Sequence, residues 1–136
     1  MTDKIFLDTN LWVYLFSDQR TKQENISRLI SENFKNIWLS AQVLGELFNV
    51  ITKKEFTPPE EAVKIVRRIS AEFPVSGIDK ATVKRAMDLK LKYHYSYWDS
   101  LIIAAALGTH CKRLYTEDLQ HKQVIENGLI IINPFK

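Results

Sequence analysis

The stretch KIFLDTNLWVYLF, Lys4 to Phe16, changes its hydrophobic pattern at one point. Its first part, KIFL (Lys4 to Leu7), is a short apolar run of the kind that forms a buried strand. Its second part, from about Asn10 to Phe16, predicts a helix. Asp8 lies between the two, and its side chain could cap that helix. The stretch therefore predicts a strand that leads directly into a helix.

Short apolar runs alternate with longer helical patterns along the rest of the chain. Further strands are predicted at Asn36 to Ser40, Phe73 to Ile78, Arg113 to Thr116 and Leu129 to Asn133. Further helices are predicted from Lys22 to Phe34, from Gln42 to Lys54, after Pro58-Pro59, from Asp79 to about Tyr93, and after Ser96. This order predicts an α/β fold: a single domain over residues 1–136, with a central, mostly parallel five-stranded sheet flanked by helices on both faces. Sites in such sheets form at the carboxyl ends of the strands.

The composition is that of an ordinary globular protein. The 136 residues are 46% hydrophobic and 26% charged, and the formal net charge is +3. This charge permits a polyanionic partner but does not by itself indicate one. The single cysteine, Cys111, excludes an internal disulfide framework and suits a reducing compartment. We find no signal peptide and no apolar run of transmembrane length, so the expected location is cytoplasmic.

Four carboxylates lie in apolar surroundings. Asp8 and Asp118 each follow a predicted strand, whereas Glu46 and Asp99 share helical faces with aliphatic residues. A carboxylate in such a position is unfavourable unless it has a partner. The four residues are therefore the first candidates for a functional site.

Each of these carboxylates also has a plain structural explanation when it is taken alone. Asp8 could cap a helix, Asp99 could favour a helix dipole, and Asp118 could belong to a turn. Glu46 is harder to explain, because it lies in the middle of a helix. Together the four suit a hard divalent cation such as Mg²⁺ or Mn²⁺, which prefers oxygen ligands.

Other kinds of site find less support. The three histidines fit no metal-ligand spacing, and we find neither a Ser-His-Asp nor a Cys-His pattern. The chain also has no GxxxxGK[ST] loop for a nucleotide. Metal-assisted hydrolysis is the chemistry that remains.

The ordered set of motifs resembles the PIN-domain family, and the chain is similar to the VapC-type toxin ribonucleases of toxin–antitoxin systems. The stretches that carry the resemblance cover nearly the whole chain: FLDTN (Phe6 to Asn10), SAQVLGELFNV (Ser40 to Val50), SYWDSLIIAAA (Ser96 to Ala106), RLYTEDLQ (Arg113 to Gln120) and IIINPF (Ile130 to Phe135).

This resemblance implies that the first and fourth strands are neighbours, which would bring Asp8 and Asp118 together. Glu46 and Asp99 would project toward them from flanking helices, and all four would be catalytic metal ligands for Mg²⁺ or Mn²⁺. The family pattern gives supporting roles to Thr9, Asn10 and Thr116, and Glu117 could contribute through water.

The implied activity is Mg²⁺-dependent endonucleolytic hydrolysis of RNA. Basic residues around the rim would hold the RNA, and the candidates are Arg20, Lys22, Lys53, Lys54, Lys90 and Lys92. Two alternatives stay open. A phosphatase with an aspartyl nucleophile would need a second Asp where this chain has Asn10. A PIN-like module that binds RNA or protein without cutting would not need the complete set of acids.

The run from Leu11 to Phe16 is apolar at every position, so a helix there would carry apolar groups on all sides. We expect that the next helix cannot cover both Trp12 and Phe16, and that another surface does. The resemblance supplies two such surfaces, a second copy of the chain and a small antitoxin. A homodimer and an antitoxin complex are therefore predicted.

Overall fold

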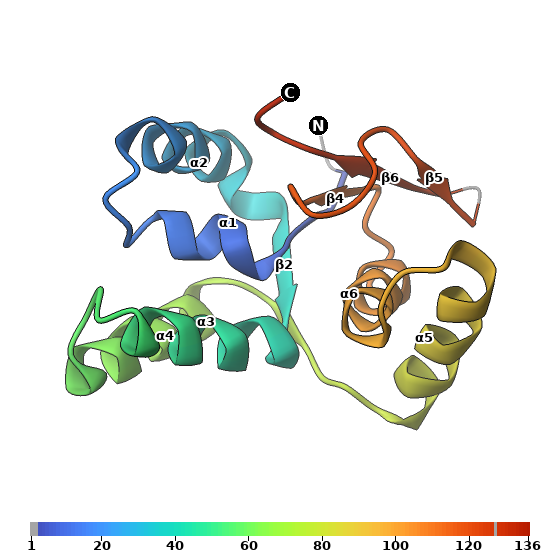
Figure 1. Cartoon of the computed structure of the whole chain (residues 1–136), viewed down its shortest axis with the longest axis horizontal. Helices are drawn as coiled ribbons and strands as arrows, with labels where there is room; N and C mark the ends of the chain where they lie inside the picture. Colours follow the sequence, from blue (N-terminus) through green and yellow to red (C-terminus); the bar gives the residue numbers. More distant parts are fainter. Residues whose placement is uncertain (1–2, 127) are drawn as a thin grey trace.

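The computed structural model describes residues 3–126 and 128–136 and has a six-stranded sheet at its centre (Figure 1). The strand order is β3-β2-β1-β4-β6-β5, and all neighbouring strands are parallel except β5 and β6. The strands are β1 (Ile5–Leu7), β2 (Ile37–Ser40), β3 (Val75–Ser76), β4 (Arg113–Tyr115), β5 (Val124–Ile125) and β6 (Leu129–Ile132).

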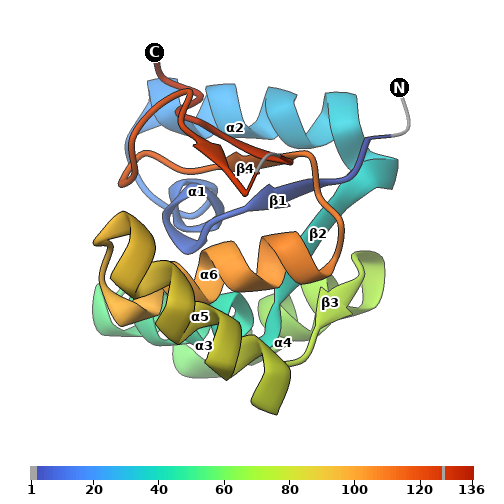
Figure 2. The ribbon, with the colours of Figure 1, turned by 90° about the vertical axis from the view of Figure 1, so that its right-hand side faces the viewer.

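Helices cover both faces of this sheet. Figure 2 shows α2 over one face, and α3, α4, α5 and α6 on the opposite side. The helices are α1 (Thr9–Tyr14), α2 (Arg20–Asn33), α3 (Ala41–Lys53), α4 (Pro59–Glu72), α5 (Lys80–Tyr93) and α6 (Tyr97–Gly108), with a short 3₁₀ helix, η1 (Phe34–Asn36). The predicted α/β class, with a mostly parallel sheet flanked on both faces, is confirmed.

The predicted number of strands is wrong by one. The additional strand, β5, has two residues and pairs antiparallel with β6 at the edge of the sheet. Two residues are too few to give an alternating pattern, so the sequence carried no signal for this strand. The strand predicted over Phe73 to Ile78 shortens to Val75–Ser76 for a related reason, because little of that edge pairs with β2.

Polar caps fix where the two site-bearing helices begin. The Ser40 side chain accepts a hydrogen bond from the backbone N–H of Val43 at the start of α3. The Ser96 side chain accepts one from the backbone N–H of Asp99 at the start of α6. Such caps satisfy backbone donors that have no partner within the helix. They therefore set which residues of α3 and α6 face the sheet.

The aromatic side chain of Trp12 is part of the core of this chain. It is only 1% exposed, it packs edge-on against Phe73 with ring centroids 5.3 Å apart, and its Nε1–H donates to the carbonyl of Leu7 at 3.2 Å. The expectation that Trp12 needs a second protein to cover it is therefore wrong. The sequence did not reveal that Phe73, at the end of α4, reaches this ring. Phe16, in contrast, stays partly exposed.

None of the helices in the described part of the chain has the length and apolar content needed to span a membrane.

Candidate active site

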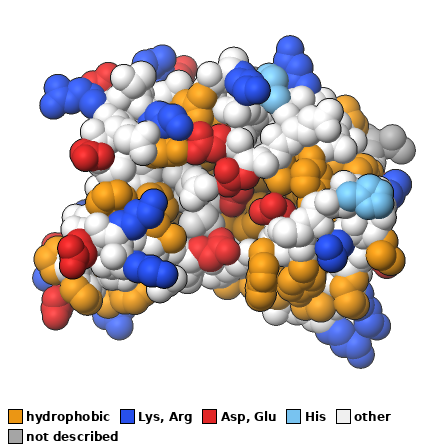
Figure 3. Space-filling model, viewed as in Figure 1, with side chains coloured by type: hydrophobic (Ala, Val, Ile, Leu, Met, Phe, Trp, Pro, Cys, Tyr) orange, Lys and Arg blue, Asp and Glu red, His pale blue; other side chains and the backbone are white. Residues whose placement is uncertain are grey.

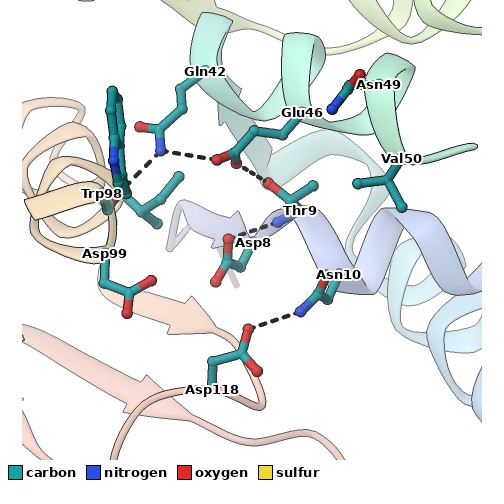
Figure 4. A pocket seen from close by; sticks show the side chains of 11 residues that line it. Asp8, Thr9, Asn10, Gln42, Glu46, Asn49, Val50, Trp98, Asp99 and Asp118 are labelled. Carbon is teal, nitrogen blue, oxygen red and sulfur yellow. Dashed lines mark hydrogen bonds between the residues drawn. The ribbon is translucent and has the colours of Figure 1, made fainter. Parts of the chain in front are cut away.

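The carboxyl ends of two neighbouring strands meet at one edge of the molecule. Asp8 follows β1 and Asp118 follows β4, and the backbone N–H of Asp8 donates to the carbonyl of Tyr115 at 3.0 Å. The carboxylates of Glu46, from α3, and Asp99, from α6, join them. All four side chains line one open pocket of about 320 Å³ (Figure 4), which we call the acid pocket. Figure 3 shows acidic side chains gathered in the central hollow of this face.

Asp8 is the most enclosed of the four acids, at 7% exposed. Its two carboxylate oxygens accept hydrogen bonds from the backbone N–H of Thr9 at 2.7 Å and from the hydroxyl of Thr116 at 2.9 Å. Burial raises the pKa of Asp8 to about 6, and repulsion from Asp118 and Asp99 adds to this effect, although the two hydrogen bonds oppose it. A nearby cation would relieve both unfavourable contributions.

Asp118 lies on the exposed loop after β4 and is held by Asn10. The Asn10 side-chain amide donates to the Asp118 carboxylate at 2.8 Å. Partial desolvation raises the pKa of Asp118, and the charge of the adjacent Glu117 raises it further. This acid therefore depends on α1 for its position.

The two helical acids enter the acid pocket from other sides. The Glu46 carboxylate accepts a hydrogen bond from the hydroxyl of Thr9 at 2.5 Å and another from the side-chain amide of Gln42 at 3.3 Å. Asp99 lies in the first turn of α6, and Figure 4 shows its carboxylate directed toward those of Asp8 and Asp118. Four separate elements thus each contribute one carboxylate.

The three residues predicted to support the site each contact an acid. Thr9 contacts both Asp8 and Glu46, Asn10 contacts Asp118, and Thr116 contacts Asp8. Their side chains hold the carboxylates along the walls of the pocket.

Glu117 is turned away from the acid pocket. Its carboxylate accepts hydrogen bonds from the hydroxyl of Tyr14 and from the ammonium of Lys22, the latter at 2.9 Å. The Lys22 ammonium also lies 4.7 Å from the centre of the Tyr14 ring and 4.8 Å from that of Phe135. The structure therefore places Glu117 in a cluster that joins α1, α2 and the end of the chain, and not among the pocket's lining residues.

The six basic residues proposed as RNA contacts do not line the acid pocket. Lys22 pairs with Glu117, and Lys92 pairs with Glu126 at 2.8 Å. Lys54 lines a smaller hollow that shares Asn10 with the acid pocket. The others are exposed on α2, α3 and α5: Arg20, Lys53 and Lys90.

Sequence reasoning missed several residues that complete the lining of the pocket. They are Gln42, Asn49, Val50, Trp98 and Ile102. Their positions follow a simple rule, since each is either adjacent to Glu46 or Asp99 or lies three or four residues away on the same helical face. Gln42 also joins two elements, because its side-chain amide donates to the carbonyl of Trp98 at 3.3 Å.

The residues of the pocket suit a hydrated hard cation better than a bare one. Among the described residues, no group of three or more His, Cys, Asp or Glu side chains is arranged so that it could hold a metal ion directly. Neutral donors hold three of the acids against separate walls. Mg²⁺ usually keeps several waters and is bound through one or two carboxylates, so an open pocket lined by oxygen donors fits it.

Comparison with known proteins points to one family. The family model of the PIN domain matches residues 5–127. Similar solved structures include the sarcin-ricin loop cleaving toxin VapC20 of Mycobacterium tuberculosis, with a TM-score of 0.69 and 19% identity, covering 85% of this chain and 90% of that one. A toxin–antitoxin complex from Klebsiella pneumoniae has a TM-score of 0.72 and 18% identity, and the match covers 98% of this chain and 99% of that one. DNA-bound VapBC from Salmonella typhimurium has a TM-score of 0.71 and 20% identity, and the match covers 94% of this chain and 96% of that one. A comparison with curated proteins found no match.

Proposed function

The chain belongs to the PIN-domain family, and from this premise we propose that it is a Mg²⁺-dependent endoribonuclease, the toxin of a toxin–antitoxin pair that acts in the cytoplasm. One observation carries the proposal: four carboxylates from four different elements line one open pocket. An unpaired cluster of this kind destabilises the free protein, so its presence is best explained by a cation that binds there. Mn²⁺ could take the place of Mg²⁺.

In this proposal Asp8, Glu46, Asp99 and Asp118 hold the cation, directly or through its waters. A bound divalent cation supplies an activated water and neutralises charge on the phosphodiester group. Thr9, Asn10 and Thr116 keep the carboxylates in place, because each donates a hydrogen bond to one or two of them. The pocket without a cation would repel a phosphate, so these acids make RNA binding depend on the metal as well.

A PIN-like module that binds without cutting is the alternative. Such a module would need Asp8 only as the cap of α1, and burial of a carboxylate for that purpose alone is unfavourable. The complete set of four acids therefore favours catalysis.

Cleavage of RNA by the purified protein tests the proposal. We expect cleavage with Mg²⁺ or Mn²⁺ and none in EDTA, and we expect Asp99→Asn to lower the rate by at least about 100-fold. Asp88→Asn is a matched control, because Asp88 is an exposed carboxylate on α5 outside the pocket. Undiminished cleavage in EDTA, or equal rates for the two variants, would exclude the metal mechanism.

The proposed protein partner is a small antitoxin. Solved structures with the same fold include toxin–antitoxin complexes, and this chain has an apolar hollow where such a partner could bind. The hollow, which we call the apolar groove, measures about 220 Å³ and lies between α1, α2 and α4. Phe34, at its edge, is 49% exposed. An apolar segment of the antitoxin would cover this ring.

Two measurements test the proposed assembly. Light scattering at micromolar concentration should give the mass of a homodimer. The product of a small reading frame next to the gene should bind the chain and inhibit cleavage, and Phe34→Ser should weaken that binding. A monomeric mass would exclude the dimer, and unchanged binding by the Phe34→Ser variant would exclude the apolar groove as the docking surface.

A further inference from the structure

The lining of the acid pocket is apolar in part. Asp8 and Asp118 follow the ends of β1 and β4, whereas α3 and α6 contribute Val50, Trp98 and Ile102 beside the other two acids. Figure 4 shows Trp98 at the rim, next to Asp99 and across from Asp118. A cation and a phosphate would contact the carboxylates. The apolar side chains are left for another part of the substrate.

Trp98 is unusually exposed for a tryptophan, at 62%. Tryptophan side chains are on average highly buried, because exposure of so large an apolar surface is unfavourable. Trp12, in contrast, is 1% exposed. The exposure of Trp98 therefore needs a reason other than packing of the core.

The exposed ring of Trp98 has one aromatic neighbour in the first turn of α6. The Tyr97 ring packs against the Trp98 ring edge-on, with centroids 5.1 Å apart and an interplanar angle of 73°. The carbonyl of Trp98 accepts a hydrogen bond from Gln42, whose amide also donates to Glu46. The position of Trp98 is thus tied to two of the pocket's walls.

We propose that Trp98 is the platform on which an unpaired base of the RNA stacks, beside the phosphodiester bond that is cut. This inference rests on the proposed function and adds a residue that positions the substrate. Base stacking on an aromatic side chain contributes about 1–3 kcal/mol and tolerates any base, because every base has a flat π-face. A base in a duplex is already stacked and paired, so only an unpaired nucleotide can use the platform.

Trp98 and Asp99 are consecutive residues, so the proposed base platform lies close to one of the four acids. Consecutive Cα atoms are about 3.8 Å apart, so the indole of Trp98 and the carboxylate of Asp99 start from neighbouring points. A single nucleotide, with its phosphate and base at opposite ends, can span the two. An uncharged ring also does not compete with the acids for the cation.

The main alternative to RNA as the molecule that covers Trp98 is a second copy of the chain. Leu91 and Met87 on α5 are also exposed, at 77% and 50%. Neither residue lines the acid pocket, whereas Trp98 does. This difference favours the substrate and also supplies a control.

Cleavage kinetics on single-stranded oligonucleotides test the platform. We expect Trp98→Ala to lower kcat/KM by about 5- to 150-fold, which is the range that 1–3 kcal/mol of stacking corresponds to, mainly through KM. Trp98→Phe keeps a flat ring and should stay within about threefold of the wild type. Trp98→Leu keeps apolar bulk without the ring and should behave like Trp98→Ala. Leu91→Ala should leave the kinetics unchanged.

A series of oligonucleotides, each with one abasic nucleotide, locates the stacked base. At one position next to the cut, removal of the base should slow the wild type and leave Trp98→Ala unaffected, because the partner of the ring is then already missing. Equal sensitivity of both proteins at every position would overturn the platform. Wild-type kinetics for Trp98→Ala would also overturn it.

Two further outcomes separate this inference from its premises. If the wild type does not cleave RNA at all, the proposed function fails, and the platform fails with it. If Trp98→Ala and Leu91→Ala both lower the mass measured by light scattering and lose activity together, a second copy covers Trp98, and the platform is overturned while the proposed function stands.

Discussion

Helix α1 contributes to two hollows of opposite chemistry. Its first residues, Thr9 and Asn10, line the acid pocket, and the residues around its end, Trp12 and Phe16 among them, line the apolar groove. The acid pocket holds charges that repel one another, whereas the apolar groove exposes rings to water. Each hollow is therefore unfavourable in the free chain for a different physical reason.

The difference shows how six residues of helix can serve two purposes. In the acid pocket, hydrogen bonds from Thr9 and Asn10 hold carboxylates that would otherwise move apart. In the apolar groove, Trp12 is fully covered while Phe34 is half exposed. The acid pocket holds four carboxylates close together, and the apolar groove has a buried residue, Trp12, at its base and a half-exposed one, Phe34, at its edge. Substitutions in the acid pocket and in the apolar groove should therefore have different effects.

The largest expected effect concerns the floor of the apolar groove. Trp12→Ala should lower the free energy of unfolding by about 3–5 kcal/mol, because it removes a buried ring and leaves a cavity beside Phe73. Phe34→Ala should lower it by less than about 1.5 kcal/mol, because half of that ring is already in water. Urea denaturation of both variants gives the comparison. Equal losses of unfolding free energy in the two variants would mean that Trp12 and Phe34 do not differ in their contribution to the core.

The next effect concerns the charge in the acid pocket and depends on pH. The pKa of Asp8 is raised from 3.8 to about 6, so the folded state binds a proton more tightly than the unfolded state. Without a cation, the contribution of Asp8 to stability should therefore be fully present below pH 4 and should be lost as the pH rises from about 4 to 6. At about 1.4 kcal/mol for each pKa unit, the loss is about 3 kcal/mol.

Asp8→Asn removes this titration. In EDTA the variant should melt at a higher temperature than the wild type at pH 7, and the difference should shrink toward pH 4. Asp88→Asn, an exposed carboxylate on α5, should show no such trend. An Asp8→Asn variant that is no more stable than the wild type at pH 7 would show that the acid pocket does not strain the free chain.

The smallest effect separates a lysine with a structural contact, Lys22, from one proposed to contact RNA, Lys54. Lys22→Met breaks the contact with Glu117 and should lower the free energy of unfolding by about 1 kcal/mol or less, as is usual for a partly exposed ion pair. Its RNA binding should keep the wild-type dependence on salt. Lys54→Met should leave stability unchanged and reduce the slope of log affinity against log salt by about 1.

Binding titrations at several salt concentrations give the measurement. A reduced slope for Lys22→Met would return Lys22 to the RNA-binding residues despite its contact with Glu117. An unchanged slope for Lys54→Met would remove Lys54 from them.

The fold could be predicted where pattern and length agree. KIFL followed by an Asp and an apolar helix was enough to predict β1 and α1, and the neighbouring positions of the first and fourth strands, implied by the resemblance, are confirmed by the pairing of β1 with β4. The two-residue strand β5 could not be predicted, because so short a segment has no periodicity. The cover over Trp12 was missed because Phe73 is 61 positions away along the chain and no local pattern joins the two.

The candidate site was also predictable only in part. Polar residues in apolar surroundings identified the four acids that the structure places in one pocket. The sequence contained no sign that Trp98 lines this pocket, because an aromatic residue at the start of a helix is usually part of the hydrophobic core. Glu117 was a plausible neighbour by spacing alone. Its direction is decided by Lys22 and Tyr14, which lie on other elements.

The pairing of β1 with β4 also has a consequence for the time at which the acid pocket can form during synthesis. Thr116 and Asp8 are 108 positions apart, so a ribosome makes the first acid long before the last parts of the acid pocket. A growing chain that stops before β4 has neither Asp118 nor the hydroxyl that holds Asp8. Stalled chains of this length should therefore leave RNA intact, even in Mg²⁺, which can be measured on purified ribosome-bound intermediates. Under the proposed function, the order of translation would withhold the complete set of acids until synthesis has passed residue 118.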